Sequence, residues 1–278
     1  MKGLYFALIL LPIFSFCQTT NDFVDQYSQV SLQITERNGT RNLYVASGFV
    51  MHVKGQRYLI TNNHVVGEEY AEQDYLHRFK KNIPRDSIPD NLLVRCYSST
   101  YGQYSNSIVR IRNRAKKFNG IKFYEDEKDT TTILDVVAIP LMRAELDGQF
   151  KWVDSSNLNN LLLLYPGMEL FVIGYPSDSG SVLPLPIWKR GTIATEPNLI
   201  EVGDSHFFID ATTRGGMSGS PVVFRGNIAI GKTGGMLAFG GGIPTFVIGI
   251  YSAQSYSLEL GVVTKLDKIY LKLRDLNP

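Results

Sequence analysis

Short apolar runs, some alternating with polar residues and some continuous, recur along most of the chain. The first alternates from Val30 to Ile34 with the two-residue period of a half-buried strand. Two further runs, 43–53 and 57–61, flank Lys54-Gly55-Gln56 and predict a hairpin. Similar runs follow at 92–97, 108–112, 133–139, 171–174, 189–195, 206–210, 221–224 and 246–253. This pattern predicts an all-β protein built from many short strands.

The last periodic stretch is helical rather than extended. Between 264 and 276 the apolar residues share one face of a helix; they are Leu266, Ile269, Tyr270, Leu273 and Leu276. The strand pattern is also interrupted by a charged stretch with two prolines at 67–91, whose first half (68–81) favours a helix, and by a glycine-rich stretch at 231–244. We interpret 67–91 as a surface insertion, either a solvated loop or a lid, and 231–244 as a mobile hairpin loop.

The strands fall into two groups on either side of a connecting stretch at 142–164. The first group spans about 27–142, the second about 165–263, and the helix about 264–276. Two packed β-barrels fit a chain of 278 residues, and 44% hydrophobic residues are enough for their core. A net charge of +2 gives no reason to expect a nucleic-acid partner.

Residues 1–17 have the composition of a secretory signal peptide. Lys2 supplies the positive start, 4–14 is too short to span a bilayer, and Ser15-Phe16-Cys17 resembles a cleavage site. We therefore expect a mature chain, 18–278, that is secreted or resides in the periplasm or cell envelope, without stable membrane insertion. An N-terminal membrane anchor and a lipidated Cys17 are the alternatives. Cleavage after Cys17 leaves Cys96 alone, and hence no internal disulfide.

A serine lies in the glycine-rich loop Gly215-Gly216-Met217-Ser218-Gly219, just before the apolar run 221–224. Glycine permits a tight turn and the close approach of a ligand. We therefore expect Ser218 to be accessible, and the amides of Gly216 and Ser218 to converge on one point, as an oxyanion hole requires. Taken alone, the stretch is equally consistent with a Gly/Ser turn between strands.

A nucleophilic serine needs a base and a group that orients the base. His64 closes the β-rich run 58–66, where a strand passes into a loop. Asp135 is the one carboxylate in the apolar run 133–139, and its burial is costly unless it is paired, for example with a histidine. We interpret His77 as a surface residue and His206 as a strand residue. The order His–Asp–Ser is that of chymotrypsin-like enzymes; the α/β-hydrolase order fails because no histidine follows Ser218.

Five segments in this order resemble the bacterial trypsin-like serine peptidases, in particular their HtrA/Deg and glutamyl-endopeptidase branches. These segments are 46–50, 61–66, 134–138, 172–176 followed by 190–194, and 216–221. The resemblance implies a chymotrypsin-like fold over 18–278, with two packed six-stranded antiparallel β-barrels and a C-terminal helix. It implies a secreted serine endopeptidase that acts on polypeptides without a cofactor or metal. By the same resemblance His64, Asp135 and Ser218 form the triad, and Gly216 and Ser218 the oxyanion hole.

The resemblance also predicts where the substrate lies. Its backbone would run along 250–253, which makes Ile250, Tyr251 and Ser252 substrate-binding residues. Thr212, six residues before the nucleophile, would form the base of the primary pocket, where it cannot neutralise lysine or arginine; Asp210 nearby leaves that point open. Tyr251 stands where the glutamyl branch has a histidine, which argues against cleavage after glutamate. We expect a small or medium apolar residue before the scissile bond.

Departures from the family leave other functions open. Met217 replaces the acid of zymogen-type members, so the resemblance implies activation without a new amino terminus. The insertions at 67–91 and 231–244 leave open a site that is inactive until a partner binds. A protease-fold binding protein with little or no catalysis, and an esterase or other acyl transferase on the same triad, are the alternative functions. The oligomeric state stays open.

Overall fold

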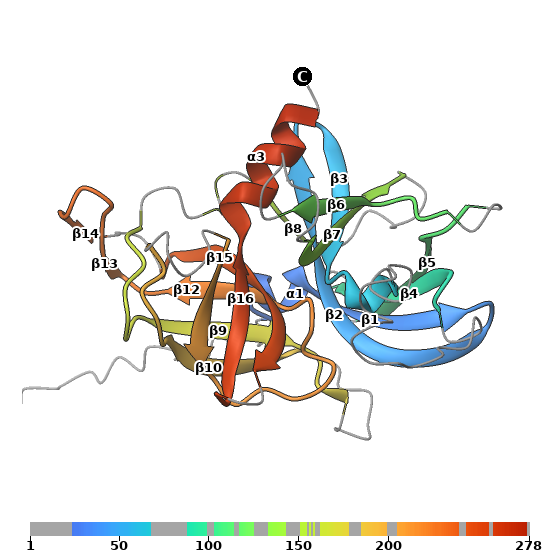
Figure 1. The fold of residues 1–278 in the computed structure, drawn as a ribbon, viewed down its shortest axis with the longest axis horizontal. Helices are drawn as coiled ribbons and strands as arrows, with labels where there is room; N and C mark the ends of the chain where they lie inside the picture. The colour runs from blue at the N-terminus through green and yellow to red at the C-terminus, as the bar shows by residue number, and fades with distance from the viewer. Residues whose placement is uncertain are drawn as a thin grey trace, which may run out of the picture.

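A computed structural model of the chain (Figure 1) describes residues 24–67, 88–98, 103–113, 117–124, 133–142, 151–154, 156, 158, 162–177, 185–198, 205–238, 243–255 and 258–276. The predicted signal peptide at 1–17 and the predicted helix at 68–81 lie outside these residues. No helix in the part that is described is both long and apolar enough to cross a membrane.

The N-terminal half is an eight-stranded sheet that follows the short helix α1 (Gln26–Val30). Its strands are β1 (Ser31–Asn38), β2 (Arg41–Val53), β3 (Gln56–Thr61), β4 (Asn91–Ser98), β5 (Gln103–Arg110), β6 (Ile121–Tyr124), β7 (Ile133–Leu141) and β8 (Trp152–Val153). Neighbours follow the order β5-β4-β1-β2-β3-β7-β6, all antiparallel, and β8 joins β2 in parallel. A single 3-10 turn, η1 (His64–Val66), follows β3.

The C-terminal half is a closed six-stranded antiparallel barrel of order β10-β11-β16-β15-β12-β9. Its strands are β9 (Glu169–Gly174), β10 (Ile187–Ile193), β11 (His206–Asp210), β12 (Pro221–Arg225), β15 (Thr245–Ser255) and β16 (Leu260–Lys265). A small hairpin of β13 (Ile228–Ile230) and β14 (Met236–Ala238) leaves the barrel between β12 and β15. The helix α3 (Leu266–Leu276) continues directly from β16 and lies beside the N-terminal sheet (Figure 1).

The predicted hairpin at 43–61 is confirmed and explains the length of β2. Val53 pairs with Gln56, and the two residues between them, Lys54 and Gly55, have φ of 44° and 84°. Two positive φ values give the turn whose twist matches antiparallel strands. From Ala46 to Met51 every residue of β2 is buried, because one face of the strand lines the N-terminal sheet and the other faces the barrel.

Three hydrophobic clusters hold the fold together. One fills the concave side of the N-terminal sheet and one fills the barrel. The third lies between the two halves and combines Phe49 of β2 with Ile173 of β9, Ile250 of β15 and Leu273 of α3, each fully buried. Because this third cluster draws on both halves, neither half can bury its apolar surface without the other.

The residues around α1 fasten the start of the described chain to the barrel. Asp25 caps the helix by accepting from the Tyr27 amide, and its carboxylate also pairs with Arg225 of β12 at 2.6 Å. The Tyr27 hydroxyl donates to the Thr245 carbonyl at 2.5 Å. The segment that precedes the first strand of the N-terminal half therefore contacts the C-terminal barrel.

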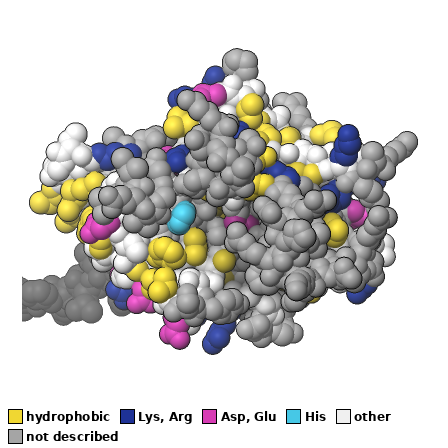
Figure 2. Space-filling model, viewed as in Figure 1, with side chains coloured by type: hydrophobic (Ala, Val, Ile, Leu, Met, Phe, Trp, Pro, Cys, Tyr) yellow, Lys and Arg dark blue, Asp and Glu magenta, His cyan; other side chains and the backbone are white. Residues whose placement is uncertain are grey.

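Hairpin β13–β14 carries exposed apolar side chains. Figure 2 shows hydrophobic side chains gathered at the left edge of the molecule, where Figure 1 places this hairpin. Ile228 is 64% exposed and Met236 is 75% exposed. The strand β14 lies within the stretch 231–244 that was predicted as a glycine-rich loop, and β13 ends just before that stretch begins, so part of the predicted loop is a strand.

The all-β class, the closed six-stranded barrel and the C-terminal helix are confirmed. The N-terminal half differs in detail from the predicted six-stranded barrel. Over the described residues its hydrogen-bonded path has seven strands with β8 beside β2, and β5 and β6 form its two ends. The chain between those ends contains one isolated bridge, Arg112 to Phe118, rather than a continuous ladder.

Candidate active site

His64 begins the 3-10 turn η1, three residues after β3 ends at Thr61. The turn closes when the Gly67 amide donates to the His64 carbonyl at 3.1 Å, and Gly67 has the positive φ of 69° that this cap requires. The imidazole thus leaves the end of a rigid sheet strand. The prediction that His64 sits where a strand passes into a loop is confirmed.

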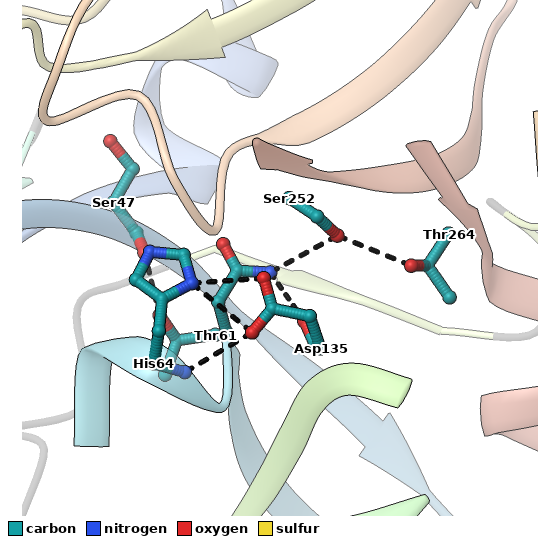
Figure 3. Close-up of polar contacts among 7 residues, drawn as sticks. Ser47, Thr61, His64, Asp135, Ser252 and Thr264 are labelled. Carbon is teal, nitrogen blue, oxygen red and sulfur yellow. Dashed lines mark hydrogen bonds and ion pairs between the residues drawn. The ribbon is translucent and has the colours of Figure 1, made fainter. Parts of the chain in front are cut away.

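Asp135 of β7 makes three contacts with His64 (Figure 3). His64 Nδ1 lies 2.9 Å from Asp135 Oδ2 and 3.1 Å from Oδ1, and the His64 backbone amide donates to Oδ1 at 3.1 Å. The two side chains are 29% and 25% exposed. The carboxylate therefore orients the ring through Nδ1 and leaves Nε2 on the opposite side of the ring.

A second layer of polar residues fixes the strand that carries Asp135. Asn62, fully buried, donates through Nδ2 to the Asp135 carbonyl at 2.6 Å and lies 3.4 Å from Ser252 Oγ. Ser252 Oγ in turn lies 3.2 Å from Thr264 Oγ1 (Figure 3). Ser252 occupies a bulge in the β15–β16 ladder, which turns its side chain toward this network. Asn62 was missed by sequence reasoning, although it is a polar residue at a strand end two positions before His64.

The loop that carries Ser218 is held by hydrogen bonds on successive peptide planes. The Gly215 carbonyl accepts from the Ser177 amide at 2.7 Å, and the Met217 carbonyl accepts from the Ser220 amide at 3.0 Å. The Met217 amide donates to the Arg214 carbonyl at 3.2 Å. Gly216 has φ of 87°, and a Cβ there would lie 2.5 Å from the Tyr175 carbonyl oxygen, so only glycine fits.

Within the described residues, three amides of the loop 215–219 have no acceptor, those of Gly215, Gly216 and Ser218. The amides of Met217, Gly219 and Ser220 all donate to backbone carbonyls. Among the residues that the structure describes, no acceptor is found for the amides of Gly216 and Ser218. Gly216 and Ser218 carry the two amides predicted to form an oxyanion hole, and both residues are half-buried, so an oxygen atom of a bound ligand can reach these amides.

The loop is tied to the strands that lead to His64. The Ser218 carbonyl accepts from the Ser47 amide at 2.7 Å, and the Ser47 carbonyl accepts from the Thr61 hydroxyl at 2.9 Å. A Cβ at Gly219 would lie 2.6 Å from Thr61 Oγ1, so the loop touches the last residue of β3. Ser218, partly exposed, is thereby anchored at the end of the strand from which His64 emerges.

The predicted pocket residues take different positions. Thr212 is exposed, whereas Thr213 is buried and its Oγ1 lies 2.5 Å from the Tyr251 hydroxyl. The Tyr251 ring lies against β16, where a Cβ at Gly261 would be 2.8 Å from Tyr251 Cε2. Asp210 is an exposed residue at the end of β11. Thr213 was missed because adjacent residues of a loop do not reveal which of them faces inward.

The predicted substrate strand is partly occupied by the barrel itself. Ile250 is fully buried and pairs with Pro221 of β12. The Tyr251 amide donates to the Ser220 carbonyl, and the Tyr251 carbonyl accepts from the Gly219 amide, both at 2.9 Å. Within the described residues the β12 side of β15 is paired no further than this point, so the open edge begins at Ser252.

Met217, which replaces the acid of zymogen-type relatives, is fully buried and belongs to the barrel cluster. Its thioether side chain anchors the loop through apolar packing. Because methionine carries no charge, residue 217 cannot form an ion pair.

Glu36 is a second carboxyl group near the histidine. It lies in β1 and is only 8% exposed, at the bulge between Thr35 and Arg37. Burial raises its pKa to about 7, and the nearby positive charge of a protonated His64 partly opposes that rise. No role was assigned to Glu36 from the sequence, although position 36 is in phase with Leu32 and Ile34, which are buried in the same strand.

The remaining histidines lie in other surroundings. His52 packs edge-on to Trp152 at 5.9 Å, and His206 packs edge-on to Phe208 at 6.2 Å. His77 lies outside the described residues. The described part of the chain holds no group of three histidine, cysteine or acidic residues that could bind a metal ion.

Comparison with known families gives one match. The profile of the trypsin-like peptidase domain matches residues 46–231, a range that includes His64, Asp135 and Ser218. No curated protein gives a significant match.

Comparison with solved structures finds similarity to several bacterial proteases. The serine endoprotease from Yersinia pestis is 14% identical with a TM-score of 0.50, over 91% of this chain and 64% of that protein. The MamO protease domain from Magnetospirillum magneticum is 14% identical with a TM-score of 0.49, over 89% of this chain and 97% of that one. Rv3671c from M. tuberculosis H37Rv, in an inactive form, is 14% identical with a TM-score of 0.46, over 90% and 87%. This chain thus spans less than two thirds of the Yersinia protein, and at this identity the likeness concerns the fold.

Proposed function

This chain belongs to the trypsin-like peptidase family, and on that premise we propose that it is a serine endopeptidase whose triad is His64, Asp135 and Ser218. The observation that carries the proposal is the 2.9 Å contact between His64 Nδ1 and Asp135 Oδ2. A carboxylate at Nδ1 holds the tautomer in which Nε2 carries the lone pair that accepts a proton.

In the proposed reaction Ser218 Oγ attacks the scissile carbonyl while His64 Nε2 takes the hydroxyl proton. Asp135 stabilises the imidazolium that results, without itself taking the proton. His64 then passes the proton to the leaving amine, the C–N bond breaks, and an acyl-enzyme remains. Water, deprotonated by His64, hydrolyses this ester and restores the Ser218 hydroxyl.

The amides of Gly216 and Ser218 serve as the oxyanion hole in this proposal. The negative oxygen of the tetrahedral intermediate needs donors that are already oriented, and each such donor is worth about 3 kcal/mol. The support for this role is that both amides lack an acceptor among the described residues, whereas the amides of Met217, Gly219 and Ser220 are bonded.

We propose that the substrate residue before the scissile bond is small. Family resemblance places the primary pocket beside the loop that precedes the nucleophile. Tyr251 is 3% exposed, and its hydroxyl bonds Thr213, a residue of that loop. A buried aromatic ring leaves room for a side chain such as alanine or valine rather than for lysine or phenylalanine.

We also propose that the chain is exported and that residues 1–17 are removed. The support is the charged start and short apolar core of that segment. The mass of the protein recovered outside the cytoplasm tests this proposal, since cleavage after Cys17 predicts a chain that begins at Gln18. An intact Met1, or a lipid mass on Cys17, would contradict it.

A serine-directed fluorophosphonate probe tests the function. We expect the wild-type protein to be labelled on Ser218 and Ser218→Ala to be unlabelled. Ser220→Ala is the matched control, because this hydroxyl lies in the same turn but is fully buried; that variant should be labelled as the wild type is. Cleavage of a peptide library by the wild type then gives the preferred residue before the scissile bond.

The outcomes separate the alternatives. A wild type that is not labelled and cleaves no peptide indicates a protease-fold binding protein. A labelled wild type that hydrolyses esters but no peptides indicates another acyl transfer. Peptide cleavage lost in Ser218→Ala supports the endopeptidase.

A further inference from the structure

The hydroxyl of Ser47 is the strongest unexplained feature near the nucleophile loop. Ser47 lies in β2, in the N-terminal half, and is fully buried. Its Oγ donates to the Gly216 carbonyl at 2.8 Å and accepts from the Tyr175 amide at 2.9 Å. One side chain of the first half therefore bonds to both the nucleophile loop and the end of β9 in the second half.

The position of the Gly216 carbonyl gives this contact its meaning. The Gly216 amide belongs to the peptide plane between residues 215 and 216, which the Ser177 amide fixes through the Gly215 carbonyl. The Ser218 amide belongs to the plane between 217 and 218, which the Ser220 amide fixes through the Met217 carbonyl. The plane between 216 and 217 joins these two, and Ser47 Oγ holds its carbonyl.

This middle plane is the one most able to turn. Gly216 has φ of 87°, and glycine crosses the φ/ψ map with little steric resistance. If the middle plane rotates, the two amides on either side of it no longer point in one direction. The Met217 amide, bonded to the Arg214 carbonyl at 3.2 Å, restrains the same plane from its other end.

We propose that Ser47 is a positioning residue for the oxyanion hole: its hydroxyl, supplied by the N-terminal sheet, locks the 216–217 peptide so that the Gly216 and Ser218 amides converge. This inference rests on the proposed function. It also assigns a role to the 46–50 segment, whose serine otherwise has no part in the reaction.

The Ser47→Ala variant tests the proposal, and Ser220→Ala is its matched control. Both remove one hydroxyl from a fully buried serine at the junction of the two halves. Ser220 Oγ has no hydrogen-bond partner among the described residues, whereas Ser47 Oγ has two. A loss caused by packing alone affects both variants, and a loss caused by the lock affects Ser47→Ala.

Steady-state kinetics with a cleaved library peptide should show kcat about 10- to 100-fold lower in Ser47→Ala, with KM within about twofold, because the hole acts on the transition state. A peptide aldehyde forms a tetrahedral adduct whose oxygen enters the same hole, so its affinity should fall by a similar factor. Ser220→Ala should match the wild type in both. An unchanged kcat in Ser47→Ala, equal losses in the two variants, or a lower kcat with unchanged aldehyde affinity would each overturn the proposal.

Hydrogen exchange of the 212–220 segment gives a readout that needs no catalysis. Faster exchange at the bonded amides of this turn in Ser47→Ala, and not in Ser220→Ala, supports the lock even if the wild type cleaves no peptide. A wild type that cleaves no peptide would by itself contradict the proposed function. Equal exchange in wild type and Ser47→Ala would end the positioning proposal while peptide cleavage by the wild type remained.

Discussion

The backbone amide of His64 and its ring nitrogen Nδ1 both lie on Asp135, and this double contact makes the carboxylate hard to replace. Oδ1 accepts from the His64 amide, and Oδ2 is 2.9 Å from Nδ1. Oδ1 contacts both the backbone amide and the ring, and Oδ2 is the nearer oxygen to the ring. Asp135 therefore fixes both the backbone of His64 and the orientation of its imidazole ring.

Asp135→Asn should abolish most activity without unfolding the protein. The asparagine oxygen would take the backbone amide and its NH₂ would face Nδ1, so Nδ1 becomes an acceptor and Nε2 carries the hydrogen. In that tautomer His64 cannot take the Ser218 proton, and we expect kcat to fall about 10⁴-fold. Measured kcat beside an unchanged melting temperature checks this; a loss below tenfold would mean that Asp135 does not set the tautomer.

Tyr251→Val should widen the range of substrates. The change keeps the backbone bonds of residue 251 to Gly219 and Ser220 but removes the ring that bonds Thr213. We expect kcat/KM for phenylalanine relative to alanine before the scissile bond to rise about tenfold or more. Thr213→Val keeps the ring and should keep the wild-type preference. Equal preferences in Tyr251→Val and wild type would place the pocket elsewhere.

Glu36 should make folding stability depend on pH. Its pKa is about 7 in the folded protein and 4.5 for the free group, so the folded state binds the proton more tightly. Stability from this group is therefore full below pH 4.5 and declines as pH rises through 7, by about 3 kcal/mol in total. Glu36→Gln mimics the protonated form and should remove this decline, which urea unfolding at pH 5 and pH 8 measures. A variant that declines as much as the wild type would assign the effect to another group.

At the scale of elements, the tight contact between the nucleophile loop and strands β2 and β3 decides what the loop tolerates. Gly219 and Gly55 have nearly the same φ, 85° and 84°. A Cβ at Gly55 meets nothing within 4 Å, whereas one at Gly219 collides with the Ser47 carbonyl. The two glycines therefore separate backbone strain from packing.

Gly55→Ala should cost about 1–2 kcal/mol of unfolding free energy, the cost of a left-handed residue. Gly219→Ala should cost about 1–3 kcal/mol more, because the loop or β2 must move to admit the methyl group. It should also lose peptide cleavage, which Gly55→Ala should retain. Denaturant unfolding and cleavage assays on both variants check this. Equal losses of unfolding free energy and of cleavage would show that the loop accommodates a methyl group at residue 219.

At the scale of the whole molecule, the cluster between the halves couples them. The N-terminal sheet supplies His64 and Asp135, the barrel supplies Ser218, and α3 returns from the barrel to pack on the sheet. The candidate site thus exists only when the halves are docked. Their docking depends on apolar residues from β2, β9, β15 and α3.

Leu273→Ala should destabilise both halves together. Leu273 is fully buried in the shared cluster, and its truncation should cost about 2–5 kcal/mol. Leu276, on the same helix and 54% exposed, should cost less than about 0.5 kcal/mol when changed to alanine. We expect a single urea transition in both variants, by fluorescence and by circular dichroism. Two separate transitions would show that the halves fold independently.

Local patterns were enough for several features. The alternation at 30–34 and the Lys54-Gly55 turn predicted strands that the structure contains, because strand period and turn chemistry are set by neighbouring residues. The helical stripe predicted α3 for the same reason. The residue types of His64, Asp135 and Ser218, together with their order, were enough to select the family.

Contacts between distant residues were not visible in the chain. Ser47 and Gly216 are 169 positions apart, and Thr213 and Tyr251 are 38 apart. Which of two adjacent threonines faces inward, and whether the serine of β2 reaches the nucleophile loop, depends on how the two halves dock. The hydrophobic periodicity of neighbouring residues carries no information about that docking.

The amino-acid sequence by itself determined the strands, the closing helix and the set of reactive groups, because these follow from short-range sterics and from side-chain chemistry. The tertiary structure alone decided which amides of the loop are left without an acceptor, that the Tyr251 hydroxyl bonds Thr213, and that β2 of one half holds the loop of the other. These depend on the packing of apolar surfaces far apart in the chain, whose outcome is a property of the assembled core.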